Sequence, residues 1–219
     1  METLGTAAQK LVRPVRHGEA DNGEAESAIG RVLEHLGFDI QSDGLKETPH
    51  RWVKAMKELT RGYDDDPEAI LSTSFEGGGY DQLVLLKDIP FVSICEHHLL
   101  PIIGKAHIGY VPVERVVGLS KLARLVDCFA RRFQIQERMT KQIADAIEKT
   151  LKPLAVGVMI EASHACMTVR GVAKPDARMI TSDVRGLFRP GPQVNEQTAT
   201  AGAAARAEFF ALIHGRGAA

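Results

Sequence analysis

The chain has 219 residues, which suits one large domain or one domain with an appended helical part. Its 27 basic and 28 acidic residues balance, so no overall field favours nucleic acid or a membrane surface as a partner. No apolar run approaches the ~20 residues that cross a bilayer, and the first residues lack the apolar core of a signal peptide. We therefore expect a soluble, cytoplasmic protein whose three cysteines stay reduced.

The N-terminal quarter of the chain reads as an arm followed by helices. Residues 1–22 mix Gly, Ala, Arg and Pro without a period, which predicts a mobile arm. Apolar residues at helical spacing predict a helix over 24–36. Thr48 and Pro49 are the start signal of a second helix, a capping side chain before a proline. The predicted buried stripe of this second helix is Trp52, Met56 and Leu59.

The rest of the chain reads as strands around two amphipathic helices. The predicted strands are 83–86 and 91–94, separated by a turn at 88–90, then 105–111, the long segment 155–171 and its antiparallel partner 178–188. Apolar stripes predict one helix that opens at Ser120 and another over 136–151. The stripes are Leu122, Leu125, Val126 and Phe129, then Met139, Ile143 and Ile147. We expect a loop over 189–205 and a short closing helix over 209–213.

The order of these elements predicts the fold class. Runs of helices and runs of strands, without the strand-helix alternation of parallel sheets, indicate an α+β fold. The expected architecture is an antiparallel sheet with two helices packed on one face, preceded by an N-terminal helical part. We expect three parts: a mobile arm over 1–22, a helical region over 23–75 and a catalytic domain over 76–219.

Two short segments carry residues that bind transition metals. Cys95 and His98 are three apart, so one tight turn can direct a thiolate and an imidazole at a single cation. If 161–170 is a strand, His164 and Cys166 lie on the same face of it, together with a threonine and Arg170. Cys95, His98 and Cys166 then supply three ligands and leave a fourth position for water, which is typical of catalytic zinc.

The alternative for each segment is ordinary packing, a buried cysteine beside a core histidine. Two separate clusters of the same ligand types favour the metal. Cys128 lies in the apolar stripe of a helix without a histidine nearby, which indicates a core residue. His97 and His164 neighbour the predicted ligands and are the natural proton carriers beside activated water, or else serve a structural role.

Basic residues at a helix start predict an anion site. The turn over 118–121 brings a capping serine, Ser120, and Lys121 to a helix N-terminus, and Arg124 lies on the same side of that helix. With Arg170 these residues could hold a polyphosphate; the alternative is a capped helix with solvated charges. Glu137 opens the next helix, where its carboxylate either complements the helix dipole or accepts hydrogen bonds from a guanine edge.

Five motifs in fixed order resemble those of the GTP cyclohydrolase I family. They are G-L-K-E-T-P-H-R, C-E-H-H, G-L-S-K-L-A-R, Q-x-Q-E-R-M-T and H-A-C-M-T-V-R-G-V, spread over roughly 27–188. The resemblance implies a tunnelling fold, assembled into a toroidal homodecamer of two pentamers with active sites at subunit junctions. It implies conversion of GTP and water to formate and 7,8-dihydroneopterin triphosphate, the entry to tetrahydrofolate or biopterin synthesis.

The resemblance also implies a role for each matching residue. The zinc ligands fall on Cys95, His98 and Cys166, and the catalytic histidines on His97 and His164. The triphosphate contacts fall on Ser120, Lys121, Arg124 and Arg170, with Arg51 as a further candidate. Glu137 matches the guanine-binding carboxylate, and the further substrate contacts fall on Gln136 and on backbone groups near Leu119 and Ile135. The departures are the long, alanine-rich 189–205 segment and the N-terminal arm.

Two other functions compete with this one. A different enzyme of the tunnelling fold would use three histidine ligands, or an unmetallated cysteine with a nicotinamide cofactor, and the Cys-His-Cys set argues against both. A catalytically silent, zinc-stapled nucleotide scaffold needs neither His97 nor His164. Iron or manganese in place of zinc, and the downstream pathway, are left open by the sequence.

Overall fold

The computed structural model describes residues 22–189 and 195–215. The predicted arm, apart from its last residue, lies outside these ranges. The chain divides into two compact units, the first ending at Lys57 and the second beginning at Glu58, and each is described by itself. The three-part division expected from the sequence stays a prediction.

The first unit contains two predicted helices, the first of them whole and the second except for its last residues. Helix α1 spans Asn22–His35, and α2 spans Thr48–Leu59, so it ends just beyond this unit. The imidazole Nδ1 of His50 lies 3.0 Å from the carboxylate of Glu26, which ties the two helices together. The predicted stripe of α2 is wrong for Trp52, whose side chain is 39% exposed, whereas the neighbouring Val53 is buried.

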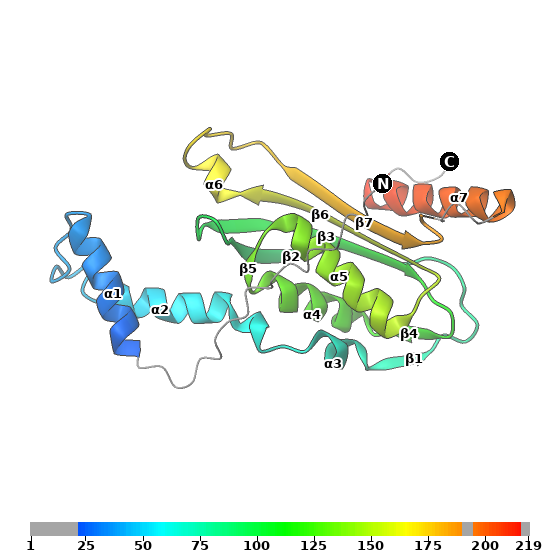
Figure 1. Cartoon of the computed structure of the whole chain (residues 1–219), viewed down its shortest axis with the longest axis horizontal. Coiled ribbons are helices and arrows are strands. Elements are labelled where there is room, and N and C mark those ends of the chain that lie inside the picture. Colours follow the sequence, from blue (N-terminus) through cyan, green and yellow to red (C-terminus); the bar gives the residue numbers. More distant parts are fainter. Residues whose placement is uncertain (1–21, 190–194, 216–219) are drawn as a thin grey trace, which may run out of the picture. The chain divides into compact units, whose positions relative to one another are not determined.

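The second unit is built on a five-stranded sheet (Figure 1). In the order in which they lie, its strands are β5 (Phe133–Gln134), β2 (Val84–Cys95), β3 (Pro101–Val111), β6 (Ala155–His164) and β7 (Met179–Gly186). All neighbours pair antiparallel except β5, which runs parallel to β2. Strands β1 (Ser74–Glu76) and β4 (Arg115–Val117) form a separate antiparallel pair. The predicted antiparallel sheet is confirmed.

Strand β2 is continuous where the sequence predicted two strands and a turn. The pairing with β3 shifts register between Leu86 and Ile89, so two residues of β2 lie opposite His107 alone, as in a β-bulge. Asp88 takes a positive φ of 59° there, and its backbone N–H donates to His107 Nδ1 at 3.2 Å. The turn residues therefore make a bulge, because the strands on both sides keep the same partner.

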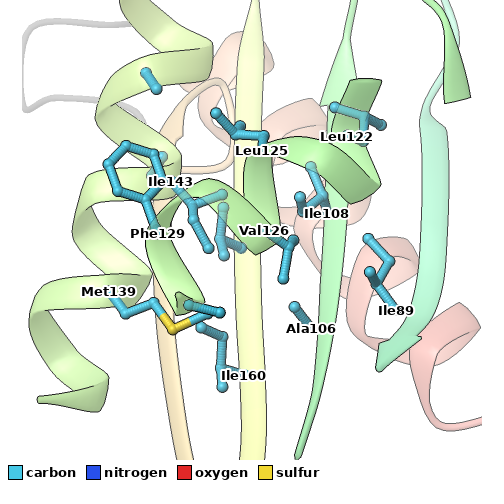
Figure 2. Close-up of a cluster of buried hydrophobic side chains, with 14 of the residues drawn as sticks. Ile89, Ala106, Ile108, Leu122, Leu125, Val126, Phe129, Met139, Ile143 and Ile160 are labelled. Atoms are coloured by element: carbon cyan, nitrogen blue, oxygen red, sulfur yellow. The ribbon is translucent and has the colours of Figure 1, made fainter. Parts of the chain in front are cut away.

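Two helices cover one face of the sheet, as predicted. They are α4 (Leu119–Ala130) and α5 (Gln136–Leu151). Figure 2 shows their stripes, including Leu125 and Ile143, packed against inward side chains of three strands such as Ile108 and Ile160. The short η1 (Arg61–Tyr63) and α3 (Pro67–Leu71) precede the sheet, and the fully buried Leu71 belongs to this same core. The tertiary fold thus buries the apolar stripe that each helix carries.

The opposite face of the sheet carries a helix that the sequence pattern predicts only at its C-terminal end. Helix α7 spans Glu196–Ile213, so most of the predicted 189–205 loop that the structure describes is helical. The Asn195 side chain accepts the backbone N–H of Thr198 at 2.8 Å and caps it. Its alanine-rich sequence lacks an amphipathic pattern but has high helix propensity, which explains the error.

Phe209 attaches α7 to the sheet. Its ring is fully buried and stacks on Phe188 with the centroids 5.6 Å apart. A Cβ placed on Gly109 or Gly157 would lie within 3.0 Å of that ring, so both glycines provide the space it fills. Phe209 and Phe188 thus belong to a second, smaller core, which attaches α7 to the sheet.

Replacing this side chain is expected to destabilise the protein strongly. Phe209→Ala should lower the free energy of unfolding by about 3–5 kcal/mol, because it removes a fully buried ring and leaves a cavity. Leu212→Ala, on the same helix but 38% exposed, is the matched control and should cost far less. Denaturant unfolding of the two variants side by side measures this, and equal losses would contradict the proposed role of Phe209.

Candidate active site

A tight turn after β2 holds the first two predicted metal ligands. The backbone N–H of Cys95 donates to the Leu100 carbonyl at 2.9 Å, and the N–H of Leu99 donates back to the Cys95 carbonyl at 2.8 Å. Leu99 has a positive φ of 54°, which closes the turn. The N–H of Glu96 donates to the Gln134 carbonyl at 3.0 Å, so the turn is fastened to the neighbouring segment.

The third predicted ligand lies on a helical turn, so the predicted strand over 155–171 is wrong beyond residue 164. Strand β6 ends at His164, and α6 spans Ala165–Thr168, with the N–H of Val169 donating to the Ala165 carbonyl at 3.0 Å. Alternation along a strand therefore does not bring His164 and Cys166 to one face. Their placement follows from β3, which pairs with β6 at His164 on one side and with β2 on the other.

The three predicted ligands nevertheless converge. The ligand atoms of Cys95, His98 and Cys166 all lie within 4.8 Å of one another, and Cys95 Sγ is 3.7 Å from His98 Nδ1. Ligands of a tetrahedral zinc ion lie about 3.5–3.8 Å apart, given bond lengths of about 2.0–2.3 Å. Two thiols and an imidazole are a soft donor set. The residues present therefore fit a metal ion.

The surroundings of Cys166 shift the pKa of its thiol. Burial raises its pKa, and the adjacent Cys95 thiol raises it further, whereas the Arg170 guanidinium opposes the shift. A bound cation would have to displace the protons from both thiols, because only thiolates ligate metals well. Arg170 therefore lies within electrostatic range of Cys166, which with Cys95 and His98 forms the group of predicted ligands called the metal cluster below.

The two predicted catalytic histidines lie beside the cluster in different settings. His97 is exposed, and its ring meets that of His98 edge-on with centroids 6.3 Å apart. His164 is half-buried, and its Nε2 lies 2.8 Å from Gln136 Oε1. Burial lowers the pKa of His164, and the nearby Glu137 carboxylate partly offsets this shift.

The start of α5 lies at the same end of the sheet as the metal cluster. Strand β5 pairs with the last residues of β2, Gln134 opposite Cys95, and α5 follows at once. This places Ile135, Gln136 and the exposed Glu137 near the cluster. The predicted guanine contacts at the start of α5 and the predicted metal ligands therefore occupy one region of the second unit.

The predicted triphosphate residues on α4 lie at the other end of the sheet. Helix α4 is about 18 Å long, and its C-terminal end is the one that leads into β5 beside Cys95. Just before its N-terminus, the N–H of Val117 donates to the Tyr110 hydroxyl at 3.0 Å, and Tyr110 pairs with Val84 at the start of β2. A single chain therefore does not bring Leu119, Ser120, Lys121 and Arg124 to its own metal cluster.

The predicted serine cap of α4 is wrong. Gly118 is the N-cap residue, no side chain caps the helix, and Ser120 lies inside the first turn. Ser120 and Arg124 are exposed, and Lys121 is half-buried. Arg51 belongs to the first unit, so its position relative to these residues is not described.

A polar cluster next to the turn that carries Cys95 and His98 was not predicted from the sequence. Arg138 pairs with the Glu96 carboxylate and donates to Gln134 Oε1 at 3.1 Å and to the Phe133 carbonyl at 3.0 Å. Gln134 in turn donates to the Phe129 carbonyl at 2.8 Å. These contacts join β5 and α5 to the turn that carries Cys95. The sequence did hold a signal for this ion pair, since Glu96 lies in the C-E-H-H motif and Arg138 in the Q-x-Q-E-R-M-T motif.

Comparison with known proteins matches this chain to one family. The family model for GTP cyclohydrolase I covers residues 25–202. A GTP cyclohydrolase 1 of Brucella anthropi is 54% identical over 171 residues, 78% of this chain and 80% of that protein. The GTP cyclohydrolase 1 of a Synechococcus species is 45% identical over 196 residues, 86% of each chain. That of Brucella abortus is 52% identical over 174 residues, 79% of this chain and 82% of that one.

Two further findings bear on structure. An apo archaeosine synthase QueF-Like shares 16% identity with a TM-score of 0.40, over 48% of this chain and 94% of that one, a likeness too weak to carry an inference. Within residues 22–189 and 195–215, no helix has both the length and the apolarity needed to span a membrane.

The family match spans far more than half of the sequence, and the quoted motifs lie within it. The chain belongs to the GTP cyclohydrolase I family.

Proposed function

We propose that this protein hydrolyses GTP at C8 of the purine, opens the ring, releases formate and closes 7,8-dihydroneopterin triphosphate. The observation that carries the proposal is the convergence of Cys95, His98 and Cys166, the last of them two residues after His164 at the end of β6, in a chain of this family. The product would be the first intermediate of a tetrahydrofolate or other pterin pathway. A cytoplasmic location is part of the same proposal.

The metal we propose is zinc, held by Cys95, His98 and Cys166. Two thiolates and an imidazole favour zinc over manganese, which prefers oxygen ligands. A zinc ion bound by three protein ligands supplies Lewis-acid activation of water near neutral pH. Cys95 is buried at the end of a strand that pairs on both sides, so the cluster is held on a rigid element.

The chain's own groups would handle the protons and the base. His164, with His97 as the second candidate, would deliver a proton to N7 as the imidazole ring opens and shuttle protons during the later ring closure. Glu137 is exposed at the start of α5 and would accept hydrogen bonds from N1–H and the 2-amino group of guanine. Backbone groups near Ile135 and Leu119 would complete the base site.

We propose that each active site is shared between copies of this chain. Ser120, Lys121 and Arg124 would hold the triphosphate of a GTP molecule bound at another subunit's metal cluster, with Arg170 and Arg51 as further phosphate contacts. The separation of α4's N-terminus from the cluster along the sheet supports this arrangement. A heterologous contact of this kind can close into a ring, and the assembly we propose is a homodecamer of two pentamers.

A direct assay tests the proposed reaction. Zinc-loaded protein incubated with GTP should release formate stoichiometrically with a product that becomes a fluorescent pterin on oxidation. Protein stripped with a chelator should do neither until zinc is restored. GTP that binds but stays intact would overturn the proposal in favour of a silent nucleotide scaffold.

The phosphate site makes a separate prediction. Lys121→Ala should weaken GTP binding about 10- to 100-fold, because a charge-assisted contact contributes about 1.5–3 kcal/mol. Guanosine, which lacks the triphosphate, should bind as before. Equilibrium binding of both ligands measures this, with Lys141→Ala as the control, since Lys141 pairs with Asp145 on the exposed side of α5. Equal losses for GTP and guanosine would remove Lys121 from the phosphate site.

A further inference from the structure

We propose that Gln136, supported by Thr181, is a positioning residue that keeps the proton of His164 on Nε2 and leaves Nδ1 to exchange protons with the substrate. This inference rests on the proposed function, in which His164 handles protons. It assigns the side chain of Gln136 to the histidine and not to GTP.

The direction in which the Gln136 amide points is determined by its surroundings. The side chain is 2% exposed. Its Nε2 lies 3.1 Å from the Ile160 carbonyl oxygen and 3.0 Å from the Met179 carbonyl oxygen. Backbone carbonyls only accept hydrogen bonds, so the NH₂ end of the amide must face them. A flipped amide would place an oxygen against two carbonyl oxygens in a buried site, which is strongly unfavourable.

The amide oxygen therefore faces the histidine. Gln136 Oε1 lies 2.8 Å from His164 Nε2, and an amide oxygen can only accept. The hydrogen of this bond must come from the imidazole, so Nε2 carries it in every protonation state of the ring. In the neutral ring Nδ1 is then the nitrogen with the free lone pair. One ring nitrogen is committed to the protein and the other is available for chemistry.

Two threonines hold the amide in place. Thr181 Oγ1 on β7 lies 3.1 Å from Gln136 Nε2 and 2.7 Å from Thr140 Oγ1. The Thr140 hydroxyl donates to the Gln136 backbone carbonyl at 2.8 Å, so the hydrogen between the two threonines comes from Thr181. The two amide hydrogens of Gln136 face three acceptors, so Thr181 Oγ1 accepts an N–H that is shared with one of the two carbonyls, and this closes a ring of hydrogen bonds. The ring joins α5 to the edge strand that flanks β6.

This network explains why the amide is poorly placed to contact GTP. A substrate contact through Gln136 would have to replace the bond to His164 or the bonds to β6 and β7, all in a buried position. Loss of those bonds is costly in a site with little access to water. Removal of the amide should therefore affect turnover and leave GTP affinity nearly unchanged.

The tautomer itself is the first readout. Solid-state ¹⁵N NMR of zinc-loaded, histidine-labelled protein without GTP should show His164 with a protonated Nε2 and a bare Nδ1, assigned by difference from His164→Asn. In Gln136→Leu, and to a lesser degree in Thr181→Val, both neutral tautomers should be populated. A wild-type His164 with its proton on Nδ1 would overturn the inference. This readout does not depend on activity, so it stands apart from a failure of the proposed reaction.

Steady-state kinetics supply the second readout. Gln136→Leu should lower kcat about 10- to 100-fold with KM for GTP within about threefold, as for other residues that orient a working histidine. Thr181→Val should lower kcat by a smaller factor, and Thr181→Ser, which keeps the hydroxyl, should restore most of it. A raised KM at unchanged kcat would show that Gln136 binds the substrate and would overturn the inference.

Thr150→Val is the matched control. Thr150 is on the same helix, and its buried hydroxyl has no hydrogen-bond partner among the described residues, so the isosteric change should alter neither the tautomer nor kcat. Circular dichroism and metal content should match wild type in all variants. If Thr150→Val lowers kcat as much as Thr181→Val, the effect is general to α5 and the inference fails.

Discussion

Cys166→Ala is expected to abolish formate release together with metal binding. The variant leaves Cys95 and His98, which lie only three residues apart on one turn and provide two of the three ligands. Loss of the metal removes several kcal/mol of Lewis-acid assistance, which corresponds to a decrease of about a thousandfold or more in turnover. Metal analysis and a formate assay on the same sample measure both effects.

Cobalt substitution makes the same test independent of turnover. Cobalt bound by thiolates gives charge-transfer absorption that should be strong in wild type and reduced or lost in Cys166→Ala. Cys128→Ser is the control, because Cys128 is buried on α4 beside Arg132, away from the cluster, and should keep full metal content. A Cys166→Ala protein that binds a full equivalent of zinc and turns over normally would refute the metal assignment.

A mixed assembly of two inactive variants is expected to recover activity. Cys166→Ala lacks a ligand, and the double variant Lys121→Ala/Arg124→Ala lacks the α4 phosphate contacts, so each alone should be nearly inactive at low GTP. If every site takes its metal cluster and its α4 residues from different subunits, about a quarter of the sites in a 1:1 random assembly are intact. Co-expression with two affinity tags, followed by native mass spectrometry and the formate assay, measures this recovery.

The matched control combines all three substitutions in one chain and mixes it with wild type. A shared site predicts about a quarter of full activity in this mixture, whereas a site within one chain predicts about half. Mixed assemblies of the two separate variants that stay inactive would contradict the shared site. They would leave the metal assignment untouched, because Cys166→Ala tests that alone.

The amphipathic helices and the central parts of the strands were predictable because their sequence patterns are local. The stripe of Leu122, Leu125 and Phe129 indicated α4 without further information, and these side chains are buried against the sheet. The spacing of Cys95 and His98 likewise predicted a turn with two ligands. Each of these features depends on residues within a few positions of one another, where the periodicity of the backbone decides which side chains share a face.

The errors lie where local signals compete with tertiary contacts. Asp88 looked like a turn residue, yet β2 continues because His107 accepts its N–H across the sheet. Segment 189–205 looked like a loop, yet the described part of it belongs mostly to α7, which is held by the burial of Phe209. The alternation expected through Cys166 fails because the strand ends at His164.

The sequence by itself determined the ligand types, the two amphipathic helices and the family motifs, since residue identity and short-range periodicity are sufficient for these. Only the tertiary structure decided that Cys166 reaches the turn of Cys95, that Gln136 faces His164, and that Lys121 lies at the opposite end of the sheet. The physical reason is that these relations depend on strand order and helix direction, which pair residues tens of positions apart and leave no periodic signal in the chain.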